Sequence, residues 1–563
     1  MKLIKKVFLF ILMISVFTAC KKYLNVNSDP TSPQTPDLAS LMTPSTSIMG
    51  KMQTIDVITV GQLIQNFSIS SAASENYDVH GGNAGGSGAN ALWRSFYAQQ
   101  GENLNLVMAK ARQEERWDYL GAAIALRAWG LQMTTNYFGE MPYYQAWDPN
   151  RFTFAYETQP TIYRVIDSLC LNAIDYLSRK DGAVNQASMA RGDNIYGGNT
   201  DKWIKFVYGV RARHWQHLTN KSTYNPDSVI YFVDHSFFNA ADNFMVPYNG
   251  TRNDDSNPWG PARNNLDNRR QSRFIVQLLD GTSFFGNTSP ASRDPRIRGL
   301  LSVSSDTTTV AANYTSLNGG YRFIPVPSGD ANQISGTGTS PNNSAITGLP
   351  TNAAYRQRVS TLYGDSIIVN TLGGSFSFSS GKFLFRNPSS LPIMAYHELQ
   401  FIKAEAAFRK GKPDVAYPSY LNGISTHFDF VENLNRSSNP TISGIASQYI
   451  AYKNSGAVKP NSGLLTLTDI MLQKYIGDFG WNLVECWSDI RRYHYFDLDP
   501  ITGLQVYRNF NISTYSTSNQ GPHPEYRYRP TNFSEFDWNY EELRKLGAVN
   551  IDYHTYEMWF SQP

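Results

Sequence analysis

The sequence predicts a mainly α-helical fold, in which paired helices form a scaffold beside a large irregular, partly β insertion. Apolar residues recur at helical spacing before residue 245 and again between 390 and 495. Between Pro247 and Pro388 the chain is instead rich in Gly, Asn, Ser and Thr, which is typical of loops and short strands. We therefore expect one domain over 45–563, with its helical scaffold at 45–245 and 390–495, the insertion at 246–389 and a loop-rich tail at 496–563.

The helices of the first scaffold segment are predicted from the spacing of their apolar residues. In the clearest one, at 117–137, Ala125, Trp129 and Met133 recur on one face. Gly139, followed by Pro142, then ends the helix. Similar spacing predicts further helices at 91–112, 161–177, 201–218 and 226–238.

Helical spacing resumes after the insertion. It predicts one pair of helices at 393–409 and 414–428, and a second pair at 464–476 and 481–492. The pairs lack a strict 34-residue period, so they are no regular TPR array, although small residues would let them pack like one. Within the insertion, alternation at 321–326 predicts a short strand, and loops this long often carry function.

The first residues predict a lipid anchor. A basic start precedes an uncharged apolar run at 7–17, which is the order of a secretory signal. That run is shorter than the roughly 20 residues that span a bilayer. Ala19 and Cys20 then form a lipoprotein cleavage site, and acyl chains on Cys20 would hold the protein at a membrane. We expect a signal peptide at 1–19 and an anchored flexible tether at 20–44; a plain secreted protein is the alternative.

The composition excludes some classes of function. A net charge of +3, with only 17% charged residues, argues against nucleic acid as a partner. Aromatic residues reach 13%, which indicates either a large aromatic core or exposed rings that stack on sugars. Apart from Cys20, the cysteines are Cys170 and Cys486, for which buried free thiols are favoured over a disulfide.

Several motifs follow one another along the chain. They are the Trp93–Tyr97 pair, the stretch at 137–143 (Tyr-Phe-Gly-Glu-Met-Pro-Tyr), the stretch at 394–406 around His397, and the Trp-x-Asp-x-Arg-Arg element at 487–492. In this order, they resemble the SusD/RagB family of nutrient-binding outer-membrane lipoproteins. The resemblance implies a scaffold of TPR-like helix pairs whose irregular insertion carries the binding face.

The resemblance also implies a function. The protein would be anchored by Cys20 in the outer membrane, facing the cell exterior. There it would bind a nutrient, a glycan or oligosaccharide above all, and deliver it to a partner SusC-like TonB-dependent transporter. Peptides stay open as ligands. We expect no enzymatic activity and no cofactor; a structural calcium ion at Asp254 and Asp255 has no support, because the loop lacks the other ligands of a calcium-binding loop.

Two groups of residues are candidates for contact with a ligand. Asn76 and Tyr77 precede a glycine-rich run that could close over a ligand, and Trp93 lies on the helix where the family places aromatic contacts. In the insertion, Asn257, Trp259 and Arg263 offer an amide, an indole and a guanidinium, which together suit a sugar. Core packing is the alternative for Trp93, and an ordinary loop is the alternative for the second group.

Two other functions are alternatives to this one. A surface glycoside hydrolase needs two carboxylates across a cleft, roughly 5–9.5 Å apart. Glu398 and Glu405 lie seven residues apart on one helix, which is about 10.5 Å along its axis. Glu405 is therefore expected to pair with a basic residue. His214 and His217 could begin a metal site on one helix, but the sequence supplies no further ligands for it. A helical envelope scaffold without a small ligand is the third hypothesis.

Overall fold

The computed structural model describes residues 36–69, 87–266, 268–286, 292–302, 321, 323, 361–363, 381–436, 444–512, 523–530 and 533–563. In these ranges, no helix has both the length and the apolar character needed to cross a membrane. The predicted signal, Cys20, the glycine-rich run and most of the strand at 321–326 lie outside them.

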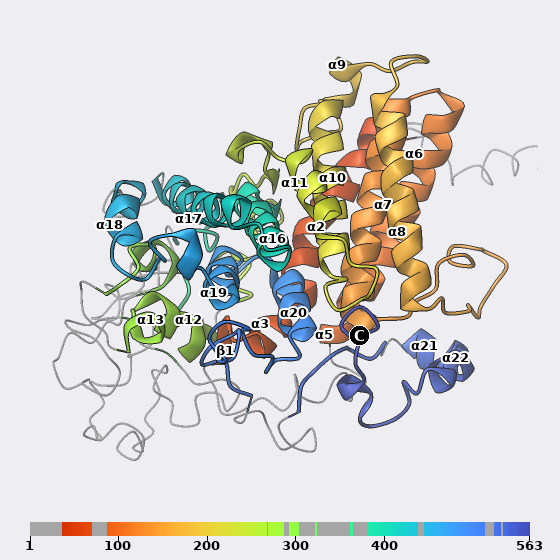
Figure 1. The fold of residues 1–563 in the computed structure, drawn as a ribbon. Coiled ribbons are helices and arrows are strands. Elements are labelled where there is room, and N and C mark those ends of the chain that lie inside the picture. The colour runs from red at the N-terminus through yellow and green to blue at the C-terminus, as the bar shows by residue number, and fades with distance from the viewer. Residues whose placement is uncertain are drawn as a thin grey trace, which may run out of the picture.

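The first group of helices stands side by side in Figure 1. Its long members pack in succession, α6 against α7, α7 against α8, α8 against α10 and α10 against α11. Helix α7 is buried nearly all round, because small and apolar residues occupy all of its faces. The elements are α2 (Leu38–Gln53), η1 (Ile55–Val57), α3 (Val60–Leu63), α5 (Ser87–Arg94), the π-helix η2 (Ser95–Gly101), α6 (Glu102–Gln113), α7 (Trp117–Phe138), α8 (Gln159–Ser178), α9 (Gln186–Met189), α10 (Thr200–Gln216), α11 (Pro226–Asp234) and η3 (Ala240–Asp242).

A second group packs beside α10 and α11. Helix α16 packs on α17, and it also contacts α11 and α19. The elements are α16 (Tyr396–Arg409), α17 (Pro413–Arg436), η9 (Ala446–Gln448), α18 (Tyr449–Lys453), η10 (Ser462–Leu464), α19 (Leu467–Gly477) and α20 (Leu483–Arg492). The insertion contributes α12 (Arg273–Leu279), α13 (Thr282–Phe285) and α14 (Ile297–Leu300), and the tail contributes α21 (Phe533–Trp538), α22 (Tyr540–Lys545) and η12 (Tyr553–Thr555). The predicted mainly α fold is confirmed.

Strands are short in the described part of the chain and form two antiparallel pairs. β1 (Phe67–Ile69) pairs with β3 (Arg269–Gln271), with Phe67 opposite Gln271. β2 (Phe244–Val246) pairs with β4 (Leu391–Met394), with Phe244 opposite Met394. The first pair therefore ties the first helical segment to the insertion, and the second pair brings the two ends of the insertion together.

Several predicted boundaries were wrong. The helix expected at 414–428 continues as α17 to Arg436, and the helix expected at 226–238 ends at Asp234. The helix expected at 393–409 begins at Tyr396, because the apolar residues before it form β4 and are all buried. The tether expected at 20–44 overlaps α2, which begins at Leu38 after its N-cap Asp37. Serines and threonines are common in linkers, but within this stretch Thr43 donates a hydrogen bond to the Ala39 carbonyl one turn back, at 3.2 Å.

Buried ion pairs join α10 to the second group of helices and hold the helices of that group together. Arg213 of α10 binds the Glu398 carboxylate through Nε and Nη2, at 2.5 and 2.6 Å. Arg492 of α20 binds both oxygens of Glu405 at 2.7 Å. The prediction that Glu405 pairs with a basic residue is thus confirmed. Lys474 of α19 lies 2.7 Å from Asp489 in the same buried layer.

The buried cysteines and histidines of the helices are structural as well. Cys170 and Cys486 are buried free thiols, which confirms the favoured prediction. His217 pairs with Glu485 at 2.8 Å, and burial lowers the pKa of His214 to about 3. Among the described residues, no cluster of His, Cys, Asp and Glu side chains could hold a metal ion.

Candidate functional site

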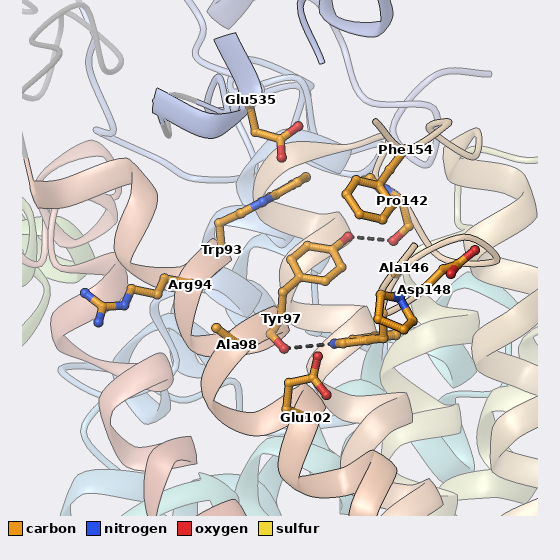
Figure 2. Close-up of a pocket in the computed structure, with 12 residues that line it drawn as sticks. Trp93, Arg94, Tyr97, Ala98, Glu102, Pro142, Ala146, Asp148, Phe154 and Glu535 are labelled. Carbon is orange, nitrogen blue, oxygen red and sulfur yellow. Dashed lines mark hydrogen bonds between the residues drawn. The ribbon is translucent and has the colours of Figure 1, made fainter. Parts of the chain in front are cut away.

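A cavity of about 520 Å³ opens where the helix bearing Trp93 faces the segment after α7. Its size falls within the range of ordinary small-molecule sites. Three parts of the chain form it: α5 with η2 and the start of α6, the loop from 142 to 154, and α21 of the tail (Figure 2). The lining residues are Trp93, Arg94, Tyr97, Ala98, Glu102, Pro142, Ala146, Trp147, Asp148, Pro149, Phe154 and Glu535.

Trp93 and Tyr97 form one wall of the cavity. Their ring centroids are 4.8 Å apart, as their four-residue spacing on the helix allows. The Tyr97 hydroxyl donates a hydrogen bond to the Pro142 carbonyl at 2.6 Å, which fixes the ring against the opposite loop (Figure 2). The Trp93 ring also packs edge-on against Phe138, and Trp93 is only 5% exposed. Trp93 therefore lines the cavity and belongs to the core at the same time.

At the cavity, the helix that carries Trp93 continues as the π-helix η2. Such segments are rare and frequently lie at functional sites. Here η2 ends at Gly101, against which the indole of Trp147 packs: a Cβ on Gly101 would lie 2.6 Å from the ring. The indole Nε1 donates to the Tyr97 carbonyl at 2.9 Å (Figure 2). A side chain at position 101 would push this indole from its place.

A buried arginine supports the Trp147 ring. The guanidinium of Arg127 lies 4.0 Å from the ring centroid, a cation–π contact. The same group donates to the Gly101 carbonyl at 2.9 Å and to Asn105 Oδ1 at 3.0 Å. Burial lowers the pKa of Arg127 to about 10, so it stays charged at neutral pH. Trp147 is thus fixed on several sides.

The tail closes the other side of the cavity through α21. Glu535 accepts hydrogen bonds from the Tyr156 hydroxyl and from Asn539 Nδ2, the latter at 3.0 Å. Asn539 Oδ1 in turn accepts from the Phe154 amide at 2.7 Å. Burial raises the pKa of Tyr156 well above its ordinary value, so its hydroxyl stays a donor. These bonds join α21 to the loop at 142–154.

The arrangement suits a ligand with flat apolar faces and hydroxyl groups. Rings form its walls, and Glu535 and Glu102 lie at opposite ends of the row of rings in Figure 2. Carboxylates accept hydrogen bonds from hydroxyls, while rings stack on apolar faces. The Arg94 side chain points away from Tyr97, so the row between the two glutamates is not basic (Figure 2).

A family model described as "Starch-binding associating with outer membrane" (SusD-like) matches residues 30–509. The chain belongs to this SusD-like family. The resemblance drawn from the ordered motifs is thereby confirmed. A comparison with curated proteins found no match.

Solved structures share the SusD-like fold. A SusD/RagB family protein from Bacteroides thetaiotaomicron is 19% identical with a TM-score of 0.60, and the match covers 92% of this chain and 98% of the other. A chitin-binding protein is 17% identical with a TM-score of 0.63, covering 94% and 100%. A Bacteroidetes SusD-like protein is 16% identical with a TM-score of 0.65, covering 94% and 100%. At these identities the likeness concerns the fold alone.

Among the predicted ligand residues that lie in the described ranges of this SusD-like fold, Trp93 reaches the cavity. Asn257 and Trp259 are fully buried, and this placement removes them from the candidate ligand surface. Asn257 Nδ2 donates to the Ser389 carbonyl at 2.7 Å, and the Trp259 indole donates to the Gly480 carbonyl at 2.6 Å. Their polar groups therefore fix the end of the insertion.

The other predicted site residues have different outcomes. Arg263 is half-buried and donates to the Asp254 carbonyl at 3.0 Å, a bond within its own loop. Asn76 and Tyr77 lie outside the described residues, as does Cys20, so these stay predictions.

Sequence reasoning missed Trp147, Phe154 and Glu535. The turn Trp147-Asp148-Pro149-Asn150 directly after the Tyr-Phe-Gly motif was a signal that could have been used, because aromatic residues on polar turns are good ligand contacts. Nothing near Glu535 in the sequence connects it with Trp93, some 440 residues earlier, since only folding brings α21 to the cavity.

Proposed function

We propose that this SusD-like chain is a lipid-anchored protein of the cell surface that binds a glycan in the Trp93 cavity. It would deliver the glycan to a partner SusC-like TonB-dependent transporter in the outer membrane. The observation that carries the proposal is the cavity itself: rings of Trp93, Tyr97 and Trp147 between the carboxylates of Glu102 and Glu535. The family description as starch-binding and the chitin-binding relative point to the same ligand class.

A glycan fits the chemistry of the cavity. A sugar ring has apolar C–H faces for stacking and a rim of hydroxyls for hydrogen bonds. The rings are locked before any ligand arrives, by the bond from Tyr97 to Pro142 and the contacts around Trp147. Preorganised rings lose little conformational freedom on binding, which favours affinity.

Binding without hydrolysis is supported by how the carboxylates are held. A general acid on a glycoside needs a raised pKa. Asp148 has a lowered pKa, chiefly because its carboxylate accepts the Asn150 amide, and it also pairs with Arg151. Glu535 Oε2 is already engaged by Tyr156 and Asn539. Glu398 and Glu405 are both buried in ion pairs away from the cavity.

The test uses the full chain purified in detergent. Arrays of starch, chitin, xylan, mannan and β-glucan oligosaccharides, with a peptide panel beside them, are titrated by tryptophan fluorescence, and the ligand is then analysed for cleavage. Saturable glycan binding with the ligand recovered intact is expected. Cleavage products would instead show that the protein is a glycoside hydrolase. No binding to any oligosaccharide or peptide would favour the third hypothesis, a helical envelope scaffold without a small ligand.

One substitution tests whether the glycan binds in the cavity. Glu102 is exposed at the rim, so Glu102→Ala should leave folding intact while removing a hydroxyl acceptor. We expect the glycan to bind about tenfold more weakly, which corresponds to the loss of one charge-assisted hydrogen bond. Glu114→Ala is the matched control, because Glu114 is exposed at the C-cap of the same helix and lies outside the cavity; this variant should bind as the unaltered chain does.

A further inference from the structure

We propose that the bound glycan continues out of the cavity across two exposed rings, Phe152 and Trp538, so that the protein selects long oligosaccharides over short ones. The inference rests on the proposed function and adds a second subsite to it. Phe152 is 71% exposed and Trp538 is 59% exposed. Their ring centroids lie only 5.7 Å apart, with planes 33° apart, so they form one continuous aromatic surface.

This aromatic pair adjoins the cavity on two separate segments. Phe152 lies two residues before Phe154, and Trp538 lies three residues after Glu535; both Phe154 and Glu535 line the cavity. Residues three apart on a helix share a face, here about 4.5 Å apart along α21. A chain that leaves the cavity beside Glu535 therefore meets the Trp538 ring within one helical turn.

The pair is held in place before a ligand binds. Hydrogen bonds from the Phe154 amide to Asn539 and from Tyr156 to Glu535 join the two segments on either side of it. The Asn539 side chain also bonds back to Glu535 at 3.0 Å. The rings thus need no ordering step when a ligand stacks on them, which lowers the entropic cost of binding.

The charges around the pair favour a neutral ligand. Arg151 pairs with Asp148 at 3.0 Å in the loop. In α22, Arg544 pairs with Glu541 at 2.9 Å, and Lys545 pairs with Glu542. Because these three basic groups each have an acidic partner, they do not form an unpaired basic patch that would attract a phosphate or a nucleic acid. Uncharged sugar units, with their stacking faces, match it.

A protein partner fits the pair less well. Two rings make a patch far smaller than the roughly 1,200–2,000 Å² that stable protein interfaces bury. A single exposed aromatic residue would need no explanation, but two that touch each other beside an aromatic cavity extend that cavity. The occupant is therefore the outer part of the same glycan chain.

The experiment is a length series on the full chain in detergent. Malto- and chito-oligosaccharides, and oligomers of any glycan that the arrays identify, are titrated from disaccharide to heptasaccharide. Affinity should rise with length for the unaltered chain. Trp538→Ala and Phe152→Ala should each weaken binding of the longest oligomers about tenfold and leave the disaccharide unchanged.

Three further variants make the result decisive. Trp538→Phe and Phe152→Tyr keep a ring and should keep the length dependence. Phe238→Ala removes an aromatic side chain that is 61% exposed and follows α11, a helix that lies well away from α21 in Figure 1. This variant should leave the affinity for every oligomer unchanged. Thermal unfolding of every variant checks that α21 stays folded against the loop.

The outcomes separate the two proposals. Equal affinity for short and long oligomers, or equal loss for both in Trp538→Ala, overturns the aromatic pair as a subsite and leaves the cavity as the glycan site. Failure to bind any glycan overturns the proposed function and the subsite with it.

Discussion

Two regions of the molecule use polar and aromatic side chains in opposite ways. In the buried layer between α10, α16, α19 and α20, every carboxylate discussed above meets a basic partner, as Glu405 meets Arg492 at 2.7 Å. At the cavity, rings instead bond to backbone groups, as Tyr97 does to Pro142, and the Glu102 carboxylate is exposed. The buried layer holds the fold together, whereas the cavity leaves the faces of its rings and the Glu102 carboxylate available.

The difference shows which residues can meet a ligand. A charge in the buried layer is already satisfied, so it adds cohesion and specificity of packing. An aromatic ring that is fixed by its neighbours but open on one face can still stack on something else. Strongly polar residues within helices are therefore poor guides to function here, and rings on the loop at 142–154 and on α21 are better ones.

The largest expected effect comes from breaking the buried layer. Glu405→Gln leaves the fully buried Arg492 with Asp489 at 2.7 Å as its carboxylate partner, and Asp489 is shared with Lys474. Removing one partner of a buried ion pair costs about 3–5 kcal/mol of unfolding free energy, because the remaining basic groups are no longer fully compensated. Urea unfolding of the variant and of the unaltered chain measures this loss of unfolding free energy.

A matched substitution on the surface sharpens that result. Glu114→Gln breaks an exposed pair with Lys110 at 3.1 Å on α6. Such pairs contribute about 0–1 kcal/mol, so little change is expected. If Glu405→Gln costs no more than this surface variant, the buried layer does not stabilise the fold as argued.

Acid should weaken the buried region before it alters the rings of the cavity. Burial lowers the pKa of His214 and of His397 to about 3, below the unfolded value near 6.5. The unfolded chain then binds more protons between these values, so stability is full above pH 6.5 and falls as the pH drops. At pH 5 the loss is about 2 kcal/mol for each histidine.

Urea midpoints at pH 7.5, 6 and 5 measure this loss. A midpoint that stays constant across this range would show that the two histidines are solvated or charged in the native protein. The rings of Tyr97 and Tyr156 give a contrast, because burial raises the pKa of both well above the ordinary value of 10, and neither changes charge in this range.

The sequence predicted the helices well and the site only in part. Helical periodicity marks α7 and α8 nearly to their ends, because each buries apolar residues along its whole length. Trp93 could be found because its helix carries a family motif. Glu535 and Trp538 could not, because no local pattern connects the tail with a loop almost 400 residues earlier. Asn257 and Trp259 had the right chemistry for a sugar, but burial, which depends on the whole fold, decides whether such side chains are accessible.

A smaller effect is expected from crowding the cavity at η2. Gly101→Ala places a methyl group 2.6 Å from the Trp147 ring and 2.7 Å from the Phe96 carbonyl. Overpacking of this kind costs about 1–3 kcal/mol, and here it also shifts the Trp147 ring. Glycan affinity should fall together with stability, measured by titration and by urea unfolding.

Gly463→Ala is the control for this change. A Cβ there would lie 3.4 Å from Asn461 Oδ1, which is ordinary contact, so neither property should change. Gly101→Ala with normal glycan affinity would show that Trp147 takes no part in the site.

The smallest effect tests one hydrogen bond at the cavity. Tyr97→Phe keeps the ring but removes the donor to the Pro142 carbonyl, whose residue is buried. A buried acceptor left without its donor costs about 1 kcal/mol. Tyr144→Phe, which removes a hydroxyl from an exposed tyrosine on the same loop, should cost nothing measurable. Because the ring stays, Tyr97→Phe should keep most of its glycan affinity while its urea midpoint falls. Equal loss of stability in both variants would mean that the loop at 142–154 is not held by Tyr97, and the cavity would then need the ligand itself to order its wall.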